Sequence, residues 1–454
     1  MTIIGLIRID LVLESAGGVT APELDAAVDL PLSRRRGGQG SDDTADDEVW
    51  VPPTSLAGSL RAHVGDDAER WFGSAPPVAG PAAEGQRHEP SRVRFLGSQT
   101  TLPSSPAVRR STAVDPRRGS ALVSTLRSRE VAPAGTTVSL FLRLDLPPDT
   151  DDLDEFADAV ASWRPIIGRG RSTGHGQATV TRIAWRRLDL RTTEGLRLWL
   201  TAGRDGLFPA ADGWQGVRTP ATPPDPEPEL DLRFSIVDAL HLGAGSTTSQ
   251  DGRTRNAIER EAGAPLLPGT TWKGMLRSRC GYILRSCGHT ACLAPAKPSC
   301  GVCILCDLFG WTGDGGQAGT AIGRVGRLTT HDSVIDGAVT HRNHVGIDRF
   351  TGGARRALLF SDEIVAEGSL SLRVHVTDPA GRDSRVPLPP AERGLLLHAV
   401  RDLHDGLIGV GRATTRGYGS LRLTDDSAPV LDELAPSHPT GAAVLALLLR
   451  GEGA

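Results

Sequence analysis

Two stretches of sequence decide the architecture: PPTSLAGSLR at residues 52–61 and PGTTWKGMLR at residues 268–277. Each places hydroxyl residues ahead of an apolar pattern of helical period, which is typical of a helix start. The two stretches also match each other position by position. Further pairs of matching blocks follow in the same order: 71–73 with 308–310, 114–117 with 347–350, 130–136 with 363–369, and 167–176 with 408–419. The chain therefore repeats one sequence, and we expect two modules of the same fold.

The domain boundaries follow from this repeat. Residues 216–228 are rich in proline, so we expect an extended linker there. The first domain is then 1–215 and the second 229–454. The second copy is longer than the first ahead of its Phe309-Gly310 pair, and the added residues, about 285–307, predict an insertion in that copy alone.

Each copy has the order strand, helix, strands, helix, strand. The opening strands alternate apolar and polar residues, and the helices show the longer helical period. This order predicts an α+β chain of two tandem ferredoxin-like (RRM-like) domains with long loop insertions, a topology that carries RNA in other proteins. The predicted strands are 4–13, 138–146 and 178–183, then 230–236, 370–376 and 420–423; the predicted helices are 56–64, 153–163, 272–284 and 391–403.

Composition narrows the class of protein. No apolar run is long enough to span a membrane, and the N-terminus lacks the pattern of a signal peptide, so we expect a cytoplasmic protein. The net charge of −4 does not by itself indicate a nucleic-acid binder. Lysine occurs only at Lys273 and Lys297, and every other cation is arginine. Arginine suits phosphate contacts, although a GC-rich genome would produce the same bias.

All six cysteines lie between Cys280 and Cys306, which favours metal ligation over a disulfide framework. Closely spaced thiolates, completed by Cys292 or a histidine, predict a closed structural zinc site. An iron–sulfur cluster and buried free thiols remain alternatives, and Cys280 is expected in the core. The candidate metal ligands are His289, Cys292, Cys300, Cys303 and Cys306.

Glycine-rich loops close both copies and contain arginine. Glycine lets backbone N–H groups approach phosphate oxygens, and the same pattern in both copies favours this over plain turns. The glycines are Gly168, Gly170, Gly174 and Gly176, and Gly409, Gly411, Gly417 and Gly419; the arginines are Arg169, Arg171, Arg412 and Arg416.

The two predicted helix starts are candidate anion sites, because a helix N-terminus presents free N–H groups. Thr54 and Ser55, like Thr270 and Thr271, are expected as N-caps. Lys273 lies in the first turn, where a cation is unfavourable to the helix. A bound phosphate would relieve this conflict, although a solvated surface lysine is the alternative.

Acidic residues beside arginines follow the first strand of each copy. Asp29 lies in residues 25–36, and Asp251 lies in residues 250–256. A carboxylate near an RNA backbone can hold Mg²⁺ or orient a 2′-hydroxyl. Solvated ion pairs are the simpler interpretation of such loops.

Together these blocks resemble the RAMP superfamily, and in particular the backbone subunits of type III CRISPR effectors. Residues 268–277 resemble that family's P-G-S-S-L-K-G helix entry, and residues 346–354 its central I-D-R-x-T-G segment. The resemblance implies that Arg61, Arg277 and Arg349 contact RNA. It also implies that a thumb-like hairpin in each module kinks the bound duplex.

In that family a loop aspartate promotes metal-dependent cleavage of target RNA, and residues 28–32, VDLPL, resemble the stretch that carries it. The resemblance therefore implies magnesium-dependent endoribonuclease activity at Asp29. The flanks of Asp251 do not match, so the second copy has the weaker case. Pro53 and the missing lysine also depart from the pattern in the first copy.

The resemblance further implies partners: guide (CRISPR) RNA, target RNA, a large polymerase-like subunit, a guide-end-capping RAMP subunit and small subunits, with no membrane. A scaffold that binds guide RNA without cutting is the alternative function. A guide-processing endonuclease is disfavoured, because no histidine recurs between the copies for acid–base work.

Overall fold

The computed structural model describes residues 3–21, 28–35, 48–74, 89–147, 152–221, 227–248, 254–313, 323–377 and 387–450. The chain forms two compact units. Unit 1 comprises Met1–Val108, Arg129–Arg171 and His175–Asp225, and unit 2 comprises Arg109–Ser128, Ser172–Gly174 and Pro226–Ala454. Two short segments from the first half of the chain therefore belong to unit 2.

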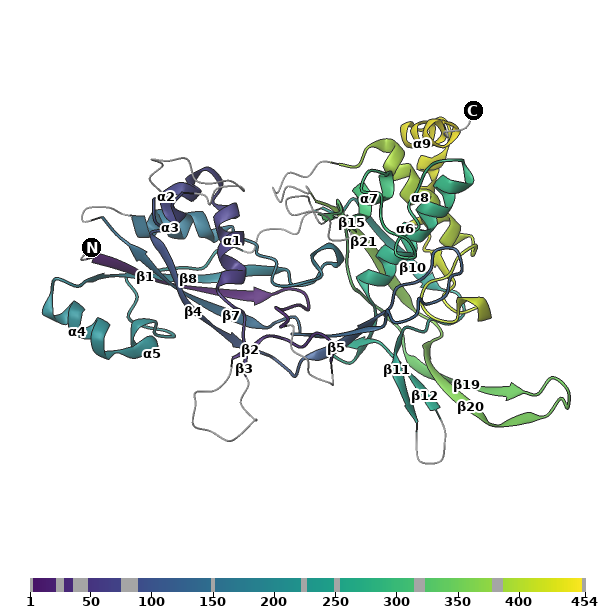
Figure 1. Ribbon diagram of the computed structural model, residues 1–454, viewed down its shortest axis with the longest axis horizontal. Helices are drawn as coiled ribbons and strands as arrows, with labels where there is room; N and C mark the ends of the chain where they lie inside the picture. Colours follow the sequence, from purple (N-terminus) through teal and green to yellow (C-terminus); the bar gives the residue numbers. More distant parts are fainter. Residues whose placement is uncertain are drawn as a thin grey trace. The chain divides into compact units, whose positions relative to one another are not determined.

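Unit 1 is built on a five-stranded antiparallel sheet in the order β4-β7-β1-β8-β9 (Figure 1). Its strands are β1 (Ile3–Leu13), β4 (Val93–Thr101), β7 (Thr137–Asp145), β8 (Ala178–Asp189) and β9 (Gly216–Arg218), with a separate pair β2 (Arg34–Arg35) and β3 (Glu48–Val49). Its helices are α1 (Thr54–His63), α2 (Ala68–Phe72), α3 (Asp152–Ala161), α4 (Thr193–Thr201) and α5 (Gly203–Leu207).

Strand β1 is central and apolar on both faces, which explains its burial along most of its length. On one face, α1 to α3 contribute Leu56, Trp71 and Phe156 to the main core of unit 1. The rings of Trp71 and Phe156 meet edge to face, with centroids 5.2 Å apart. On the opposite face, a smaller cluster around Phe141 and Phe208 holds α4 and α5.

Unit 2 contains a four-stranded antiparallel sheet in the order β17-β21-β10-β22. Helices α6 and α8 cover one face, so β10 alternates buried and exposed residues along its length. The elements of this core are β10 (Leu230–Ile236), β17 (Leu328–Thr330), β21 (Ser369–Val376), β22 (Leu421–Leu423), α6 (Gly269–Ser286) and α8 (Pro390–His404).

A second sheet of unit 2, in the order β11-β12-β20-β19, carries a long hairpin (Figure 1). Its strands are β11 (Gly243–Thr248), β12 (Thr254–Ile258), β19 (Val339–Ile347) and β20 (Ala354–Val365). In the first half of the chain, β5 (Ala107–Ser111) and β6 (Arg127–Val131) pair in a shorter hairpin, whose outer part Arg109–Ser128 belongs to unit 2.

Smaller elements complete unit 2. They are β13 (Arg260–Glu261), β14 (Ala264–Leu267), α7 (Ile304–Phe309), β15 (Gly310–Thr312), β16 (Gly323–Val325), β18 (Ser333–Val334) and α9 (Pro439–Leu449). Helix α9 packs on α8, with Val444 against Gly394. No helix was predicted from the sequence at the position of α9.

The predicted α+β class is confirmed. Each unit runs strand, helix, two strands, helix, strand, and the second, third, first and fourth strands lie side by side in that order, as in the ferredoxin-like fold. The predicted strands and helices occur with boundaries shifted by a few residues. Within the described ranges, no helix is long and apolar enough to cross a membrane.

Candidate nucleic-acid interface and metal centre

The glycine-rich loops of the two units make the same backbone contacts. The Gly176 N–H donates to the carbonyl of Ala16 (3.0 Å), and the Gly419 N–H donates to the carbonyl of Ala239 (2.6 Å). These N–H groups are therefore used within the chain, whereas we had expected the loop glycines to leave them free for phosphate. The loops can still offer their arginines, because all four side chains are exposed: Arg169, Arg171, Arg412 and Arg416.

The loop contacts also fix the register of the repeat. A Cβ on Gly168 would lie 1.8 Å from the carbonyl oxygen of Gly18, and a Cβ on Gly411 would lie 2.6 Å from that of His241. Both glycines have positive φ (86° and 89°), which other residues rarely adopt. Gly168 thus corresponds to Gly411, a register that the matched blocks 167–176 and 408–419 did not fix because they differ in length.

The Asp29 side chain is exposed in unit 1, and it lies directly before a residue that is fixed to the fold. Leu30 forms an isolated β-bridge with Arg129, and the N–H of Leu32 donates to the carboxylate of Glu130 (2.9 Å). Arg34 binds the same carboxylate at 2.8 Å and 3.1 Å. Glu130 therefore holds the segment that presents Asp29.

The same carboxylate arrangement in unit 2 shows which residue stands in place of Asp29. The Ile258 N–H donates to Glu363 (3.0 Å), as Leu32 does to Glu130. Asn256 forms a parallel β-pair with Asp362, and Leu30 forms a parallel β-bridge with Arg129. One residue earlier, the counterpart of Asp29 is Arg255, a cation. Asp251 lies outside the described residues.

Arg61 and Arg277 have equivalent structural roles. The Arg61 guanidinium donates to the carbonyls of Phe72 and Gly73 (both 2.9 Å), and the Arg277 guanidinium donates to the carbonyl of Gly310 (2.8 Å). Each thereby joins the first helix of its unit to the Phe-Gly pair that follows. Their contact with RNA stays a prediction.

The helix starts differ from the predicted N-caps. Pro53 is the N-cap of α1 and Pro268 that of α6, and neither helix has a side-chain cap. At α6, the Gly269 N–H donates to the carboxylate of Asp332 (2.7 Å). A carboxylate of the chain itself thus occupies an anion position that we had assigned to phosphate. Thr54, Ser55 and Thr270 are exposed, and Thr271 is half-buried.

Lys273 is half-buried on α6 in unit 2. Its ammonium lies 3.3 Å from the carbonyl oxygen of Leu328 and 3.5 Å from that of Ser172. Burial, assisted by the charge of Arg277, lowers the pKa of Lys273 to about 8. Lys273 is therefore not a fully solvated surface lysine: its ammonium is half-buried and is held mainly by carbonyl dipoles.

This lowered pKa predicts a pH dependence of stability. Between about pH 8 and 10.5 the unfolded chain keeps the Lys273 proton that the folded chain loses, so the free energy of unfolding rises with pH in that window. We expect wild type to gain up to ~3 kcal/mol there relative to Lys273→Met. Urea unfolding across this range measures the gain. Lys297→Met, at the exposed lysine, is the control and should keep the wild-type slope; equal slopes for wild type and Lys273→Met would contradict the prediction.

A polar cluster around the buried Asp362 joins the β19–β20 hairpin to the glycine-rich loop of unit 2, and no sequence pattern pointed to it. Asp362 accepts a hydrogen bond from Asn256 (2.6 Å) and lies 3.1 Å from the His344 Nε2 atom. His344 in turn contacts the Tyr418 hydroxyl (2.8 Å), and Arg416 approaches Asp362 at 3.8 Å. Only the spatial neighbourhood reveals this cluster, because its members lie far apart in sequence.

Arg349 is exposed at the turn of the β19–β20 hairpin. The neighbouring Asp348 accepts N–H bonds from Phe350 (2.9 Å) and Thr351 (3.0 Å), and these bonds lower the pKa of its carboxyl. The Phe350 side chain is 90% exposed. The turn thus presents a cation and an aromatic ring, which suit contact with phosphate and base.

Arg109 fixes the β5–β6 hairpin within unit 2, and no sequence pattern pointed to it. Its buried guanidinium pairs with Glu259 and Glu261 (both 2.9 Å) and donates to the carbonyl of Arg260 (2.9 Å). Glu259 is also buried, and this burial raises the pKa of its carboxyl although Arg109 opposes the shift.

The cysteines of the insertion converge on one point. The sulfurs of Cys292, Cys300, Cys303 and Cys306 lie within 4.8 Å of one another. Cys306 is 3.7 Å from Cys292 and 3.6 Å from Cys303, and a tetrahedron with 2.3 Å Zn–S bonds has edges of about 3.8 Å. The group could hold a metal ion and fits zinc.

The surroundings act differently on the four thiols: burial raises the pKa of Cys292 to about 12 and also raises that of Cys306, whereas the pKa of Cys300 is lowered. Burial opposes ionisation of Cys300, but backbone N–H groups of Val302 and Cys303 lower its pKa to about 6. His289, the alternative ligand, instead lies 2.9 Å from the carbonyl oxygen of Leu447. Cys280 is fully buried in the core, as predicted.

Residues 233–422 match the family described as the RAMP superfamily. The matched region covers the core of unit 2, its long hairpin, the cysteine group and the second glycine-rich loop. No curated protein matches the chain.

Proposed function

The chain belongs to the RAMP superfamily through residues 233–422, and on that premise we propose that it is a backbone subunit of a type III CRISPR RNA-guided effector complex. RAMP proteins act in CRISPR complexes with RNA, so RNA is the expected partner. The proposal extends to guide RNA along both halves of the chain, to target RNA paired with it, and to the large, small and guide-capping subunits.

One observation carries the extension to both halves: equivalent contacts recur in unit 1, outside the matched residues. Three kinds of contact occupy corresponding positions in the two units. They are the loop hydrogen bonds of Gly176 and Gly419, the guanidinium hydrogen bonds of Arg61 and Arg277, and the backbone N–H bonds accepted by Glu130 and Glu363. These recurrences support a fusion of two backbone modules. Each module would place its exposed loop arginines against successive stretches of one RNA strand.

Target cleavage is assigned to the first module. Asp29 itself is exposed, and Glu130 fixes the residues that follow it. A carboxylate there can hold Mg²⁺, which would stabilise charge at the scissile phosphate. Arg255 occupies the corresponding position in unit 2 and cannot bind a cation, which favours a second module that binds RNA without cutting. Zinc in the cysteine group would be structural, because four thiolates leave no open position.

The test is cleavage of labelled target RNA by the assembled complex in Mg²⁺. Asp29→Ala is expected to slow one set of cuts by about 10²–10⁴-fold while target binding is kept. Asp212→Ala, at an exposed acid elsewhere in unit 1, is the control and should cut normally. Wild-type cleavage by Asp29→Ala would remove the acid we assign and leave the non-catalytic scaffold as the function.

A further inference from the structure

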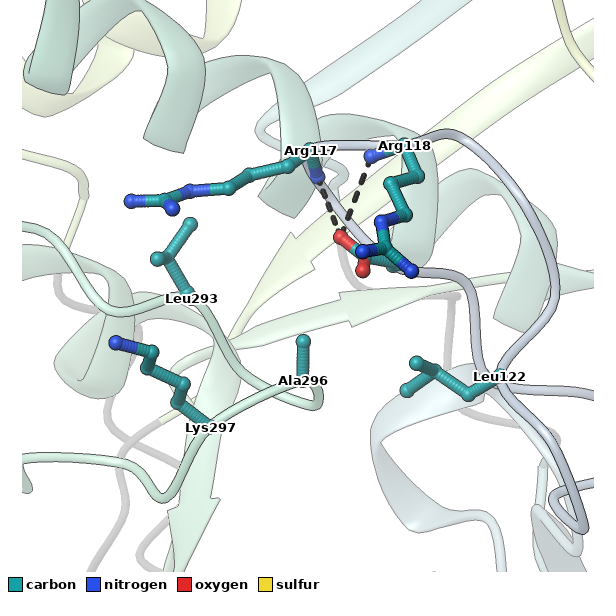
Figure 2. A pocket seen from close by; sticks show the side chains of 7 residues that line it. Arg117, Arg118, Leu122, Leu293, Ala296 and Lys297 are labelled. Atoms are coloured by element: carbon teal, nitrogen blue, oxygen red, sulfur yellow. Dashed lines mark hydrogen bonds between the residues drawn. The ribbon is translucent and has the colours of Figure 1, made fainter.

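A basic hollow in unit 2 lies between the turn of the β5–β6 hairpin and the cysteine-containing insertion. Its volume is about 350 Å³, within the range of small-molecule sites. Figure 2 shows the hairpin residues on one side and the insertion residues opposite them. The lining residues are Asp115, Arg117, Arg118, Leu122, Leu293, Ala296 and Lys297.

The cations of this hollow outnumber its acids, because Asp115 is the one acidic residue among the lining residues. Among the described residues, no direct ion pair joins Arg117, Arg118 or Lys297 to an acid, although the charge of Asp115 acts on Arg118 and Arg117. The Asp115 carboxylate instead accepts the backbone N–H groups of Arg117 (2.8 Å) and Arg118 (3.3 Å), drawn as dashed lines in Figure 2. Asp115 therefore shapes the turn, and the hollow keeps an excess of positive charge.

Both walls are fixed before any ligand arrives. The Asp115 N–H donates to the Ser120 carbonyl (2.9 Å) and closes the turn. The ion pair of Arg109 with Glu259 attaches the hairpin to the rest of unit 2. On the other side, Arg285 donates to the carbonyl of Cys292 (3.2 Å), next to Leu293. A preorganised site loses less free energy on binding than a mobile one.

We propose that this hollow binds one nucleotide through its phosphate. Two guanidinium groups and an ammonium can donate hydrogen bonds to all the oxygens of a phosphate. A carboxylate ligand has only two oxygens and would leave some of these donors unused. The apolar lining of Leu122, Leu293 and Ala296 offers contact to a ribose or base, as nucleotide sites require. The ligand is a nucleotide of a bound RNA strand. That the nucleotide comes from RNA rests on the proposed function, whereas phosphate binding by the hollow does not depend on it.

The test uses the full-length, zinc-loaded chain and titration calorimetry with adenosine 5′-monophosphate, adenosine, an acidic peptide and a single-stranded RNA. The pocket variant is Arg117→Gln, Arg118→Gln and Lys297→Gln. The control changes the same charge at exposed arginines that do not line the hollow: Arg127→Gln, Arg401→Gln and Arg422→Gln.

We expect the monophosphate to bind wild type and control, and adenosine and the peptide to bind neither. The pocket variant should bind the monophosphate at least about tenfold more weakly, and its RNA affinity should have a smaller salt slope than that of the control, by about 0.7 per lost phosphate contact. Equal monophosphate affinity in pocket variant and control, or equally tight adenosine or peptide binding, would overturn the proposal. If the pocket variant loses monophosphate binding but keeps its RNA affinity, the bound nucleotide does not belong to an RNA strand.

A separate variant distinguishes this outcome from failure of the proposed function. Replacing the four exposed loop arginines with glutamine leaves the hollow intact: Arg169, Arg171, Arg412 and Arg416. Full RNA affinity in that variant would count against the backbone function, while its monophosphate binding would still report on the hollow.

Discussion

Cys303→Ser is expected to abolish stoichiometric zinc binding and to unfold the insertion of unit 2. Structural zinc contributes an apparent ~10–16 kcal/mol to folding in small zinc domains, because the unfolded chain has no preformed site. A serine hydroxyl cannot replace the thiolate that lies 3.6 Å from Cys306. Metal analysis of the purified variant measures the zinc, and proteolysis near residues 287–303 reports the loss of structure.

Cys287 provides the matched control for this result. It lies at the start of the same insertion, is exposed, and is outside the group of four converging sulfurs. Cys287→Ser should keep wild-type zinc content and protease resistance. Full zinc content in Cys303→Ser would show that the four-cysteine assignment is wrong, whereas zinc loss in both variants would indicate a different ligand set.

The helices and most strands of the two ferredoxin-like cores were predictable because each depends on local pattern, whereas α9 and the strands of the second sheet of unit 2 were not predicted. Alternation predicted β10, and helical periodicity after the prolines predicted α1 and α6. The cysteine group was also predictable, since its close spacing limits the ligand choices. Its fourth member was left open between Cys292 and His289 until the structure placed His289 against the carbonyl of Leu447.

What the sequence could not predict depends on contacts between distant residues. Asp332 reaches the start of α6 from 63 positions away, and Arg109 reaches Glu259 across 150. Neither contact produces a periodic pattern in the amino-acid sequence. The glycine-rich loops failed for a different reason: the local pattern fits Gly409 and Gly411 equally well, and only the close approach of Gly411 to the carbonyl of His241 decides the register.

Arg109→Met is expected to destabilise unit 2 by about 3–5 kcal/mol, because it leaves Glu259 buried without its partner. Methionine keeps much of the side-chain volume, so the loss reports the charge. Arg127→Met, at an exposed arginine of the same hairpin, should change stability by less than about 0.5 kcal/mol. Urea unfolding measures both, and a loss for Arg109→Met no larger than that for Arg127→Met would contradict the role given to the ion pair.

The pH dependence of the Arg109→Met variant separates charge from packing. Burial already raises the pKa of Glu259, and loss of Arg109 removes the main force that opposes this shift. With a raised folded pKa, the folded state binds more protons than the unfolded state, so the free energy of unfolding falls as pH rises through that window. The defect should therefore shrink at acidic pH, and Glu259→Gln in the same chain should recover much of it at neutral pH. A defect that is constant with pH and unrelieved by Glu259→Gln would mean that packing, rather than the paired charges, holds this hairpin to unit 2.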